Sequence, residues 1–235
     1  MDITAIVLAG GMGTRLRSVV VDRPKVLAPV AGKPFIAYLF AQLEEMGVRH
    51  AILSTGYLAE TFVDVLGERQ GSLQLQYVQE DSPLGTGGAV RWVGQHVRTS
   101  HAIVLNGDSY VNADLREYVS WHEQLENDVS LMLVPVADAS RYGTVEIDAE
   151  SRVTAFLEKR PERVAGRINA GIYLLRSELF DQIPDGKCSL EADVLPKWLK
   201  SYRVKGFTSA GEFIDIGIPE DYHRSHQFME RFKRV

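Results

Sequence analysis

The sequence predicts an α/β protein with a Rossmann-like, three-layer α/β/α architecture around a mostly parallel, mixed central sheet. Three observations lead to this prediction. Short apolar runs alternate with segments of helical periodicity through the first half of the chain. The second half is more typical of strands joined by a hairpin. The 235 residues, 45% hydrophobic and 24% charged, can bury one large core without disulfides or a structural metal.

The first half predicts four buried strands separated by helices. The strands are expected at 3–8, 51–55, 73–78 and 102–105, and the helices at 34–47, 58–66 and 86 to about 96. Pro34 can open the first helix and Gly47 can close it. Parallel strands joined by right-handed crossovers bring their carboxyl ends to one edge of a sheet, where ligands bind in such folds.

The second half predicts mixed and antiparallel strands. Strands are expected at 129–136 and 171–175, a hairpin at 144–148 and 153–157, and helices at 190–199 and 219–232. The chain has no internal repeat and no linker-like segment. We therefore expect a single domain over residues 1–235.

Composition excludes several classes of function. With 26 Lys and Arg against 31 Asp and Glu, the net charge is −5, so the positive surplus that a nucleic-acid partner requires is absent. Cys188 is the only cysteine, which prevents an intrachain disulfide and favours a reducing compartment. The longest apolar run, 129–137, is too short for a membrane span, and the start lacks a basic signal-peptide region. We expect a cytoplasmic protein with neither nucleic acid nor membrane as a partner.

A glycine-rich loop follows the first predicted strand directly. Its three glycines allow successive backbone N–H groups to point at an anion such as a phosphate. The loop is not a dinucleotide fingerprint, because Leu16 stands where a third spaced glycine would fall, and no P-loop Gly-Lys-Ser/Thr follows. A simple tight turn is the alternative. The nucleotide-binding candidates of the loop are Leu8, Ala9, Gly10, Gly11, Gly13, Thr14 and Arg15.

Two cations accompany this loop. Arg15 lies at its end, and Lys25 follows Pro24, which restricts the backbone. Each could be a solvated surface charge, but beside a glycine loop the pair can clamp a polyphosphate. We therefore predict that Arg15 and Lys25 act in nucleotide binding and in catalysis.

Two aspartates are candidates for a metal site. Asp108 ends the fourth predicted strand, and Asp215 stands among apolar residues before Gly-X-Pro. Carboxylates at the carboxyl edge of a sheet are well placed to hold Mg²⁺ through oxygen, although each could be an ordinary turn or cap residue. We predict Asp108 and Asp215 as metal ligands, with Asp108 also a nucleotide-binding and catalytic residue.

The segment 82–89 precedes the third predicted helix and contains three glycines. Gly85 could let a base or ribose lie on the backbone. Just upstream, Glu80 could accept two hydrogen bonds from guanine but only one from uracil or thymine. Simple loop exposure is the alternative for Glu80.

Further polar residues in the second half suit a sugar phosphate. Glu158 and Asn169 could bind hydroxyl groups, Lys159 could bind a second phosphate, and the run around Gly143 could form another wall. Each signal is weak when taken singly. The six histidines show no metal-binding spacing with a cysteine.

Together these motifs resemble the sugar-1-phosphate nucleotidyltransferases, or NDP-sugar pyrophosphorylases. The resemblance follows the chain in order, at 8–16, 24–25, 84–88, 106–108, 142–143, 158–159, 169–171 and 215–217. It implies the nucleotide-diphospho-sugar transferase type of fold, with a nucleotide-binding part at about 1–115 and a sugar-phosphate-binding part at about 116–235. It further implies Mg²⁺ and the reaction NTP + sugar 1-phosphate → NDP-sugar + pyrophosphate, which supplies glycan biosynthesis.

The resemblance also implies roles for single residues. Lys25 would stabilise charge on the α-phosphate and the departing pyrophosphate. Lys159 would grip the sugar phosphate, while Glu158, Asn169 and Gly143 would contact the sugar.

Within the family, residues 17–19, 83–89, 141–145 and 213–222 look most like the D-glycero-α-D-manno-heptose 1-phosphate guanylyltransferases, which implies GTP as the nucleotide donor. The rivals are mannose 1-phosphate guanylyltransferases and N-acetylmuramate or hexose 1-phosphate uridylyl- or thymidylyltransferases. A non-catalytic nucleotide-sugar sensor and an NAD-binding oxidoreductase are alternatives of other classes. The intact Lys25 and Asp108 argue against the first, and Leu16 against the second. The sugar stays open, as does the oligomeric state, for which a homodimer is one option.

Overall fold

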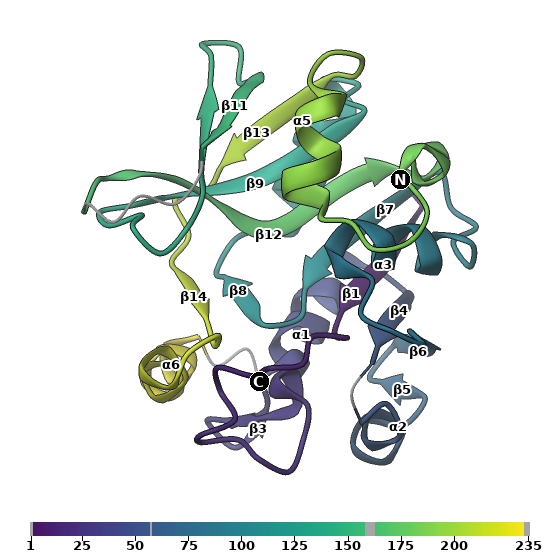
Figure 1. Ribbon diagram of the computed structural model, residues 1–235, viewed down its shortest axis with the longest axis vertical. Helices are drawn as coiled ribbons and strands as arrows, with labels where there is room; N and C mark the ends of the chain where they lie inside the picture. The colour runs from purple at the N-terminus through teal and green to yellow at the C-terminus, as the bar shows by residue number, and fades with distance from the viewer. Residues whose placement is uncertain (1, 57, 158–162, 233–235) are drawn as a thin grey trace.

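A computed structural model describes residues 2–56, 58–157 and 163–232, and one large sheet runs through it (Figure 1). The strand order is β11-β10-β12-β7-β1-β4-β6-β5, and β9 pairs with both β12 and β13. The strands are β1 (Ile3–Leu8), β2 (Pro29–Val30), β3 (Lys33–Pro34), β4 (His50–Thr55), β5 (Arg69–Gln70), β6 (Leu73–Gln79), β7 (His101–Asn106), β8 (Ser109–Val111), β9 (Val129–Val136), β10 (Thr144–Ile147), β11 (Val153–Leu157), β12 (Gly166–Arg176), β13 (Val204–Thr208) and β14 (Phe213–Asp215).

Helices cover both faces of this sheet, and in Figure 1 α3 and α5 lie in front of it while α1 lies behind. The helices are α1 (Ile36–Met46), α2 (Glu60–Leu66), α3 (Gly85–Gly94), α4 (Leu115–Gln124), α5 (Leu195–Trp198) and α6 (Pro219–Arg231). Alternation along the strands explains the two faces. In β1, Val7 packs into the core beneath α1, α2 and α4, whereas Ile6 packs into the core beneath α3 and α5. The predicted three-layer fold with a mostly parallel, mixed sheet is confirmed.

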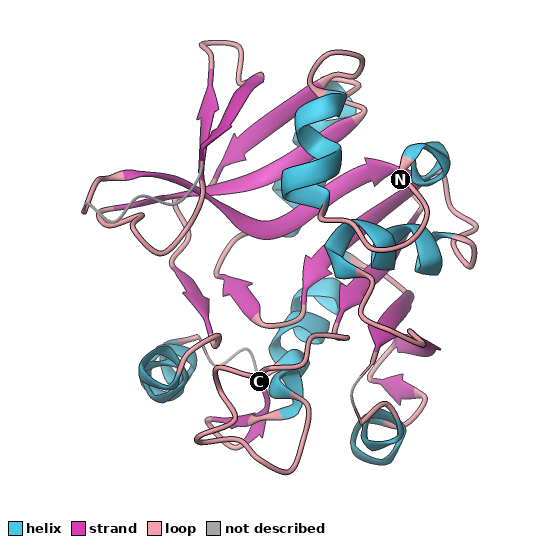
Figure 2. Ribbon diagram, in the orientation of Figure 1, coloured by secondary structure: helices cyan, strands magenta, loops and turns pink. Residues whose placement is uncertain are grey.

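The two halves of the chain differ in strand direction, as expected. Strands β7, β1, β4 and β6 are parallel, whereas β12 is antiparallel to β7, β9 and β10. Both halves contribute strands, magenta in Figure 2, to the same ten-stranded sheet. The structure therefore joins the halves by backbone hydrogen bonds.

Strand β12 is longer than the predicted 171–175 and carries an irregularity. Its pairing with β9 shifts register between Asn169 and Tyr173. Gly171 lies inside this shift with φ +76°, and a Cβ there would be 2.6 Å from the Asn106 side chain. The shift therefore brings β12 close to the end of β7.

Several elements were not predicted from the sequence. Helix α4 is the largest, although Asp114 caps it by accepting from the N–H groups of Arg116 and Glu117. Strands β8 and β14 form a separate two-stranded ribbon, and α6 packs against it. Among the described residues, no helix is both long enough and apolar enough to cross a membrane.

Candidate functional site

A pocket of about 280 Å³ opens where β1 and β7 end. Predicted nucleotide-binding residues make up much of its lining, and others were not predicted. The lining residues are Leu8, Ala9, Gly10, Gly11, Met12, Lys25, Val26, Glu80, Pro83, Gly85, Thr86, Ala89, Asn106 and Asp108. The carboxyl edge of the parallel strands therefore gathers the expected glycine loop, cation and carboxylate in one place.

Lys25 and Asp108 form an ion pair at this pocket, through Lys25 Nζ and Asp108 Oδ2. Lys25 begins a short 3-10 turn, Lys25–Leu27, in which Val26 and Leu27 are buried. Only 13% of its side chain is exposed, against 34% for Asp108. Two residues that are 83 positions apart in the sequence thus form an ion pair beside the glycine loop.

Three predicted loop residues lie outside the pocket lining: Gly13, Thr14 and Arg15. Arg15 is exposed, and one of its terminal nitrogens lies 3.6 Å from the position of a Cβ built on Gly217. The Arg15 guanidinium is therefore beside the turn that follows Asp215.

The candidate metal ligands Asp108 and Asp215 are brought close by backbone pairing. Asp215 in β14 lies opposite Ser109 in β8, and the Ile216 N–H donates to the Asp108 carbonyl at 2.9 Å. The Asp215 carboxylate accepts from the Tyr142 hydroxyl and, at 2.8 Å, from the Gly217 N–H. Burial, with the hydrogen bond to Asp215, raises the pKa of Tyr142 well above its usual range, so this hydroxyl is a donor.

Asp108 and Asp215 alone supply too few ligands for Mg²⁺, so further oxygen ligands must come from a bound molecule. Residues 2–56, 58–157 and 163–232 contain no cluster of three or more His, Cys, Asp or Glu side chains that could hold a metal. Mg²⁺ is bound in many nucleotide sites by one or two carboxylates plus substrate phosphates. The all-oxygen pair Asp108 and Asp215 fits that pattern if phosphates supply the remaining ligands.

Glu80 is buried, with 8% exposure, and lines the same pocket. Its Oε1 accepts from the Ser54 hydroxyl at 2.8 Å, and its Oε2 accepts from the Leu84 N–H at 2.9 Å. A Cβ on Gly10 would lie 2.5 Å from Oε1. The carboxylate thus joins β4 to the segment before α3 by hydrogen bonds and lies against the glycine loop.

Gly85 has a packing role that the sequence did not reveal. Its φ is +71°, and a Cβ there would lie 2.5 Å from the Cys188 carbonyl oxygen. The N–H groups of Gly87 and Gly88 donate to that carbonyl at 3.0 and 3.3 Å. The segment around Cys188 therefore packs directly on the first turn of α3.

A second pocket, of about 460 Å³, adjoins the first and shares Thr86 and Asn106 with it. Predicted Gly143 and Asn169 lie in its wall, whereas predicted Glu158 and Lys159 lie outside the described residues. Its lining residues are Thr86, Asn106, Arg141, Tyr142, Gly143, Thr144, Val145, Phe156, Leu157, Asn169, Tyr173, Ser189, Glu191 and Ala192.

Sequence reasoning missed five of these polar residues: Thr86, Asn106, Tyr173, Ser189 and Glu191. Thr86 stands inside the Gly-Thr-Gly-Gly run and Asn106 inside Asn-Gly-Asp, so both motifs pointed to them. Glu191 follows Ser189, whose hydroxyl caps the next turn by accepting from the Ala192 N–H. Tyr173 lies in an apolar strand and gave no local signal.

The Rossmann-like sheet has two adjoining pockets at its carboxyl edge, one of them lined by a glycine loop, a lysine and an aspartate, which is an arrangement suited to an enzyme that acts on a nucleotide. The chain matches the Nucleotidyl transferase family over residues 4–231. It belongs to that family, and the sugar-1-phosphate nucleotidyltransferase class expected from its motifs is confirmed.

Two relatives and one solved structure show which members of this class the chain is similar to. The chain is 39% identical over 229 residues to D-glycero-α-D-manno-heptose 1-phosphate guanylyltransferase of Aneurinibacillus thermoaerophilus, covering 97% of this chain and 99% of that protein. It is also 39% identical over 227 residues, or 95% of its length, to mannose-1-phosphate guanylyltransferase of Mycobacterium tuberculosis, of which it spans 63%. The crystal structure of HddC from Yersinia pseudotuberculosis complexed with GMP-PN has a TM-score of 0.85 and 37% identity, covering 98% of this chain and 99% of that one.

Proposed function

We propose that this protein transfers GMP from GTP to a sugar 1-phosphate, giving a GDP-sugar and pyrophosphate, with D-glycero-α-D-manno-heptose 1-phosphate as the preferred acceptor. The observation that carries the proposal is the pair of adjoining pockets that share Thr86 and Asn106. A nucleotide in the first pocket and a sugar phosphate in the second would meet at that boundary. The full-length similarity to a heptose 1-phosphate guanylyltransferase supports the choice of substrates.

The proposed reaction needs no protein nucleophile. The second pKa of a phosphate monoester is about 6, so a sugar 1-phosphate is largely a dianion at neutral pH and its oxygen can attack the α-phosphorus of GTP directly. A new P–O bond forms there while the bond to the β-phosphate bridging oxygen breaks, and pyrophosphate leaves with that electron pair. Charge repulsion and alignment are the obstacles, as in other phosphoryl transfers.

The protein's part in this proposal is to supply positive charge and alignment. Lys25 and Arg15 would offset charge on the triphosphate and on the leaving pyrophosphate. Because Lys25 is paired with Asp108, bound phosphates would compete for Lys25 and a cation would compete for Asp108. Asn169 and Gly143 would contact the sugar, together with Glu158, and Lys159 would hold the attacking phosphate.

Asp108 and Asp215 are the residues proposed to hold Mg²⁺. When bound, the ion would withdraw negative charge from the phosphate oxygens. Glu80, at the wall of the first pocket, is the proposed guanine contact. A cytoplasmic location suits the nucleoside triphosphate donor and the single thiol of Cys188.

Mannose 1-phosphate is the second candidate acceptor. The similarity to a mannose-1-phosphate guanylyltransferase has the same 39% identity, although the chain spans a smaller part of that protein. Both candidates share GTP as donor and differ only in what fills the second pocket.

A substrate panel tests the proposal. Four nucleoside triphosphates would be combined with the 1-phosphates of D-glycero-α-D-manno-heptose, mannose, glucose and N-acetylmuramate, and pyrophosphate release would be measured with Mg²⁺ present. We expect the highest kcat/KM for GTP with the heptose. A preference for UTP or dTTP would overturn the guanine assignment. No release from any combination would leave the nucleotide-sugar sensor as the better reading.

A further inference from the structure

Glu191 lines the second pocket and accepts hydrogen bonds from two other residues of its wall, one of which also lines the first pocket. Its Oε2 accepts from the Thr86 hydroxyl at 2.7 Å, and its Oε1 accepts from the Tyr173 hydroxyl at 2.5 Å. Thr86 lines both pockets, whereas Tyr173 lines only the second. One carboxylate therefore joins α3, in the nucleotide-binding half, to β12.

The backbone around Glu191 is fixed. It lies in a π-helical turn, Leu190–Val194, that packs against α3. The Leu190 N–H donates to the Thr86 hydroxyl oxygen at 2.8 Å, and the Ser189 hydroxyl donates to Glu191 Oε2 at 2.8 Å. Single π-helical turns occur frequently at functional sites.

The same chain of hydrogen bonds orients Asn169. Tyr173 is fully buried, and burial with the Glu191 charge raises its pKa well above its usual range, so it keeps its proton. Its hydroxyl donates a hydrogen bond to Glu191 and accepts one from Asn169 Nδ2 at 2.8 Å. The Gly171 N–H donates a hydrogen bond to Asn169 Oδ1 at 3.0 Å.

Counting donors shows what Asn169 offers to a ligand. Its amide has two N–H groups, and Tyr173 takes one. Its oxygen already has a backbone partner, so the amide cannot turn over without losing both bonds. The second N–H is therefore the group that Asn169 can present to an acceptor oxygen in the second pocket.

Resting on the proposed function, we infer that Glu191 is a positioning residue that couples the pockets. It holds Thr86 at the boundary of the nucleotide pocket and, through Tyr173, sets the direction of the Asn169 N–H toward the sugar. Nucleotide bound beside Thr86 then stabilises the hydrogen-bonded arrangement that directs the Asn169 N–H into the second pocket. The sugar 1-phosphate consequently binds more tightly to the nucleotide complex than to the free enzyme.

The test compares binding with and without nucleotide. Calorimetry would measure the Kd of D-glycero-α-D-manno-heptose 1-phosphate alone, and with saturating Mg²⁺ and α,β-methylene GTP, whose α,β bridge cannot be cleaved. For the wild type we expect a gain in affinity of about 5-fold or more, the lower end of measured couplings. In Tyr173→Phe and Glu191→Gln the gain should fall below about 2-fold. Phenylalanine has no hydroxyl, and glutamine has one acceptor oxygen for the three hydroxyl groups that donate to Glu191.

Kinetics supply a second readout. The KM for the sugar 1-phosphate should rise about 3- to 10-fold in both variants, the effect of one lost hydrogen bond, while the KM for GTP stays within about 2-fold. Tyr38→Phe is the matched control, because it removes another buried tyrosine hydroxyl, one that bonds to the Val30 carbonyl away from both pockets. It should leave the binding gain and both KM values unchanged.

The outcomes separate the two proposals. If the wild type releases pyrophosphate but shows no binding gain, or if both variants keep the gain, the coupling is wrong and the proposed function stands. If the wild type releases no pyrophosphate with any sugar phosphate, the proposed function is wrong, and the coupling between the pockets, which rests on it, is wrong as well. Melting temperatures of the variants identify any loss that comes from misfolding.

Discussion

Lys25 and Asp108 neutralise each other beside the glycine loop, and Lys25 is mostly shielded from water. A cation held in that position interacts more strongly with phosphate charge than one in bulk solvent. We expect Lys25→Ala to lower kcat by about 10²-fold, the effect of removing one preorganised donor. Steady-state pyrophosphate release measures it. The control is Lys200→Ala, at an exposed lysine outside both pockets, and an unchanged kcat in Lys25→Ala would remove Lys25 from catalysis.

Asp108→Asn keeps the shape of the side chain but removes its charge. If Asp108 binds the metal, turnover in this variant should not be restored by Mg²⁺ at concentrations that saturate the wild type. A Mg²⁺ titration of activity checks this. Asp64→Asn, at an exposed position on α2, should titrate like the wild type. Full activity of Asp108→Asn at ordinary Mg²⁺ would contradict the ligand assignment.

The position of some site residues could be predicted from the sequence, and that of others could not. Gly10 and Asp108 lie soon after the ends of β1 and β7, so the order of strands and helices was enough to place them at one edge of the sheet. Lys25 lies farther along the chain, and its charge beside the glycine loop was the signal that indicated it. Tyr173 and Glu191 could not be placed in this way. Their importance comes from hydrogen bonds between segments far apart in the chain, which no local pattern records.

At the scale of elements, α4 depends on its cap. The Asp114 side chain accepts from two N–H groups at the start of the helix. Asp114→Ala should therefore lower the free energy of unfolding by about 1 kcal/mol without changing KM. Denaturant unfolding measures the loss. Ser120→Ala, an exposed substitution in the middle of the same helix, should cost nothing, and equal losses in both variants would argue against the cap.

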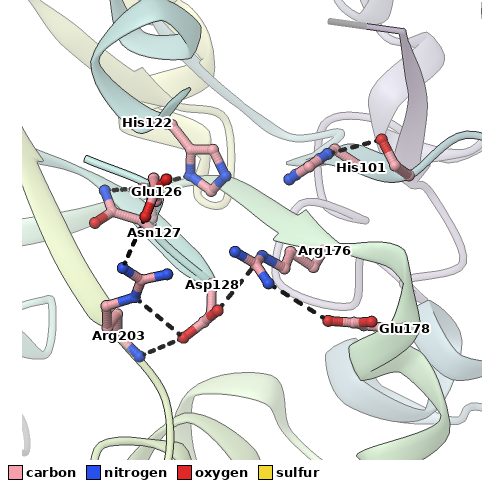
Figure 3. Close-up of polar contacts among 10 residues, drawn as sticks. His101, His122, Glu126, Asn127, Asp128, Arg176, Glu178 and Arg203 are labelled. Carbon is pink, nitrogen blue, oxygen red and sulfur yellow. Dashed lines mark hydrogen bonds and ion pairs between the residues drawn. The ribbon is translucent and has the colours of Figure 1, made fainter. Parts of the chain in front are cut away.

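A buried histidine joins α4 to β9 (Figure 3), and its burial predicts that stability depends on pH. His122 is 1% exposed, and its Nδ1 lies 2.7 Å from the Ser130 hydroxyl. Burial, helped by His101 and Arg176 and opposed by Asp128, lowers the pKa of His122 to about 4. The folded protein thus prefers neutral His122, while the unfolded chain takes up a proton near pH 6.5.

Stability should therefore be full above about pH 6.5 and fall as the pH drops toward 4. Thermal melts across that range would show the decline. Replacing His122 by glutamine should flatten the profile, whereas His50→Gln, at an exposed histidine, should leave it unchanged. Identical profiles for all three proteins would exclude His122 as the source.

Elements with a strong periodic pattern were predicted well, and short ones were not. Strands β1 and β9 have the predicted bounds, because both are mostly apolar and mostly buried. Strands β8 and β14 have three residues each and pair only with one another, so they give no periodic signal. Helix α4 has a cap and apolar spacing that could have been found, and it was overlooked.

For the whole molecule, one continuous sheet predicts one cooperative unfolding transition that ligand shifts upward. α,β-Methylene GTP with Mg²⁺ at about 100 times its Kd should add about 2.7 kcal/mol, which raises Tm by about 5 to 10 °C in a chain of this size. Scanning calorimetry measures both quantities. Two separate transitions, or a shift with ATP as large as that with GTP, would contradict the expectation.

Strand β12 has a consequence for engineering. One part of it pairs with β7, whose end borders the first pocket, and the part beyond the register shift carries Asn169 into the second. Main-chain pairing therefore fixes the distance between the two pockets. If they bind donor and acceptor as proposed, the side chains of the second pocket decide which acceptor fits. A single inserted residue would turn Asn169 to the opposite face of the sheet. Libraries that seek a different product should vary side chains of the second pocket and leave the length of β12 untouched.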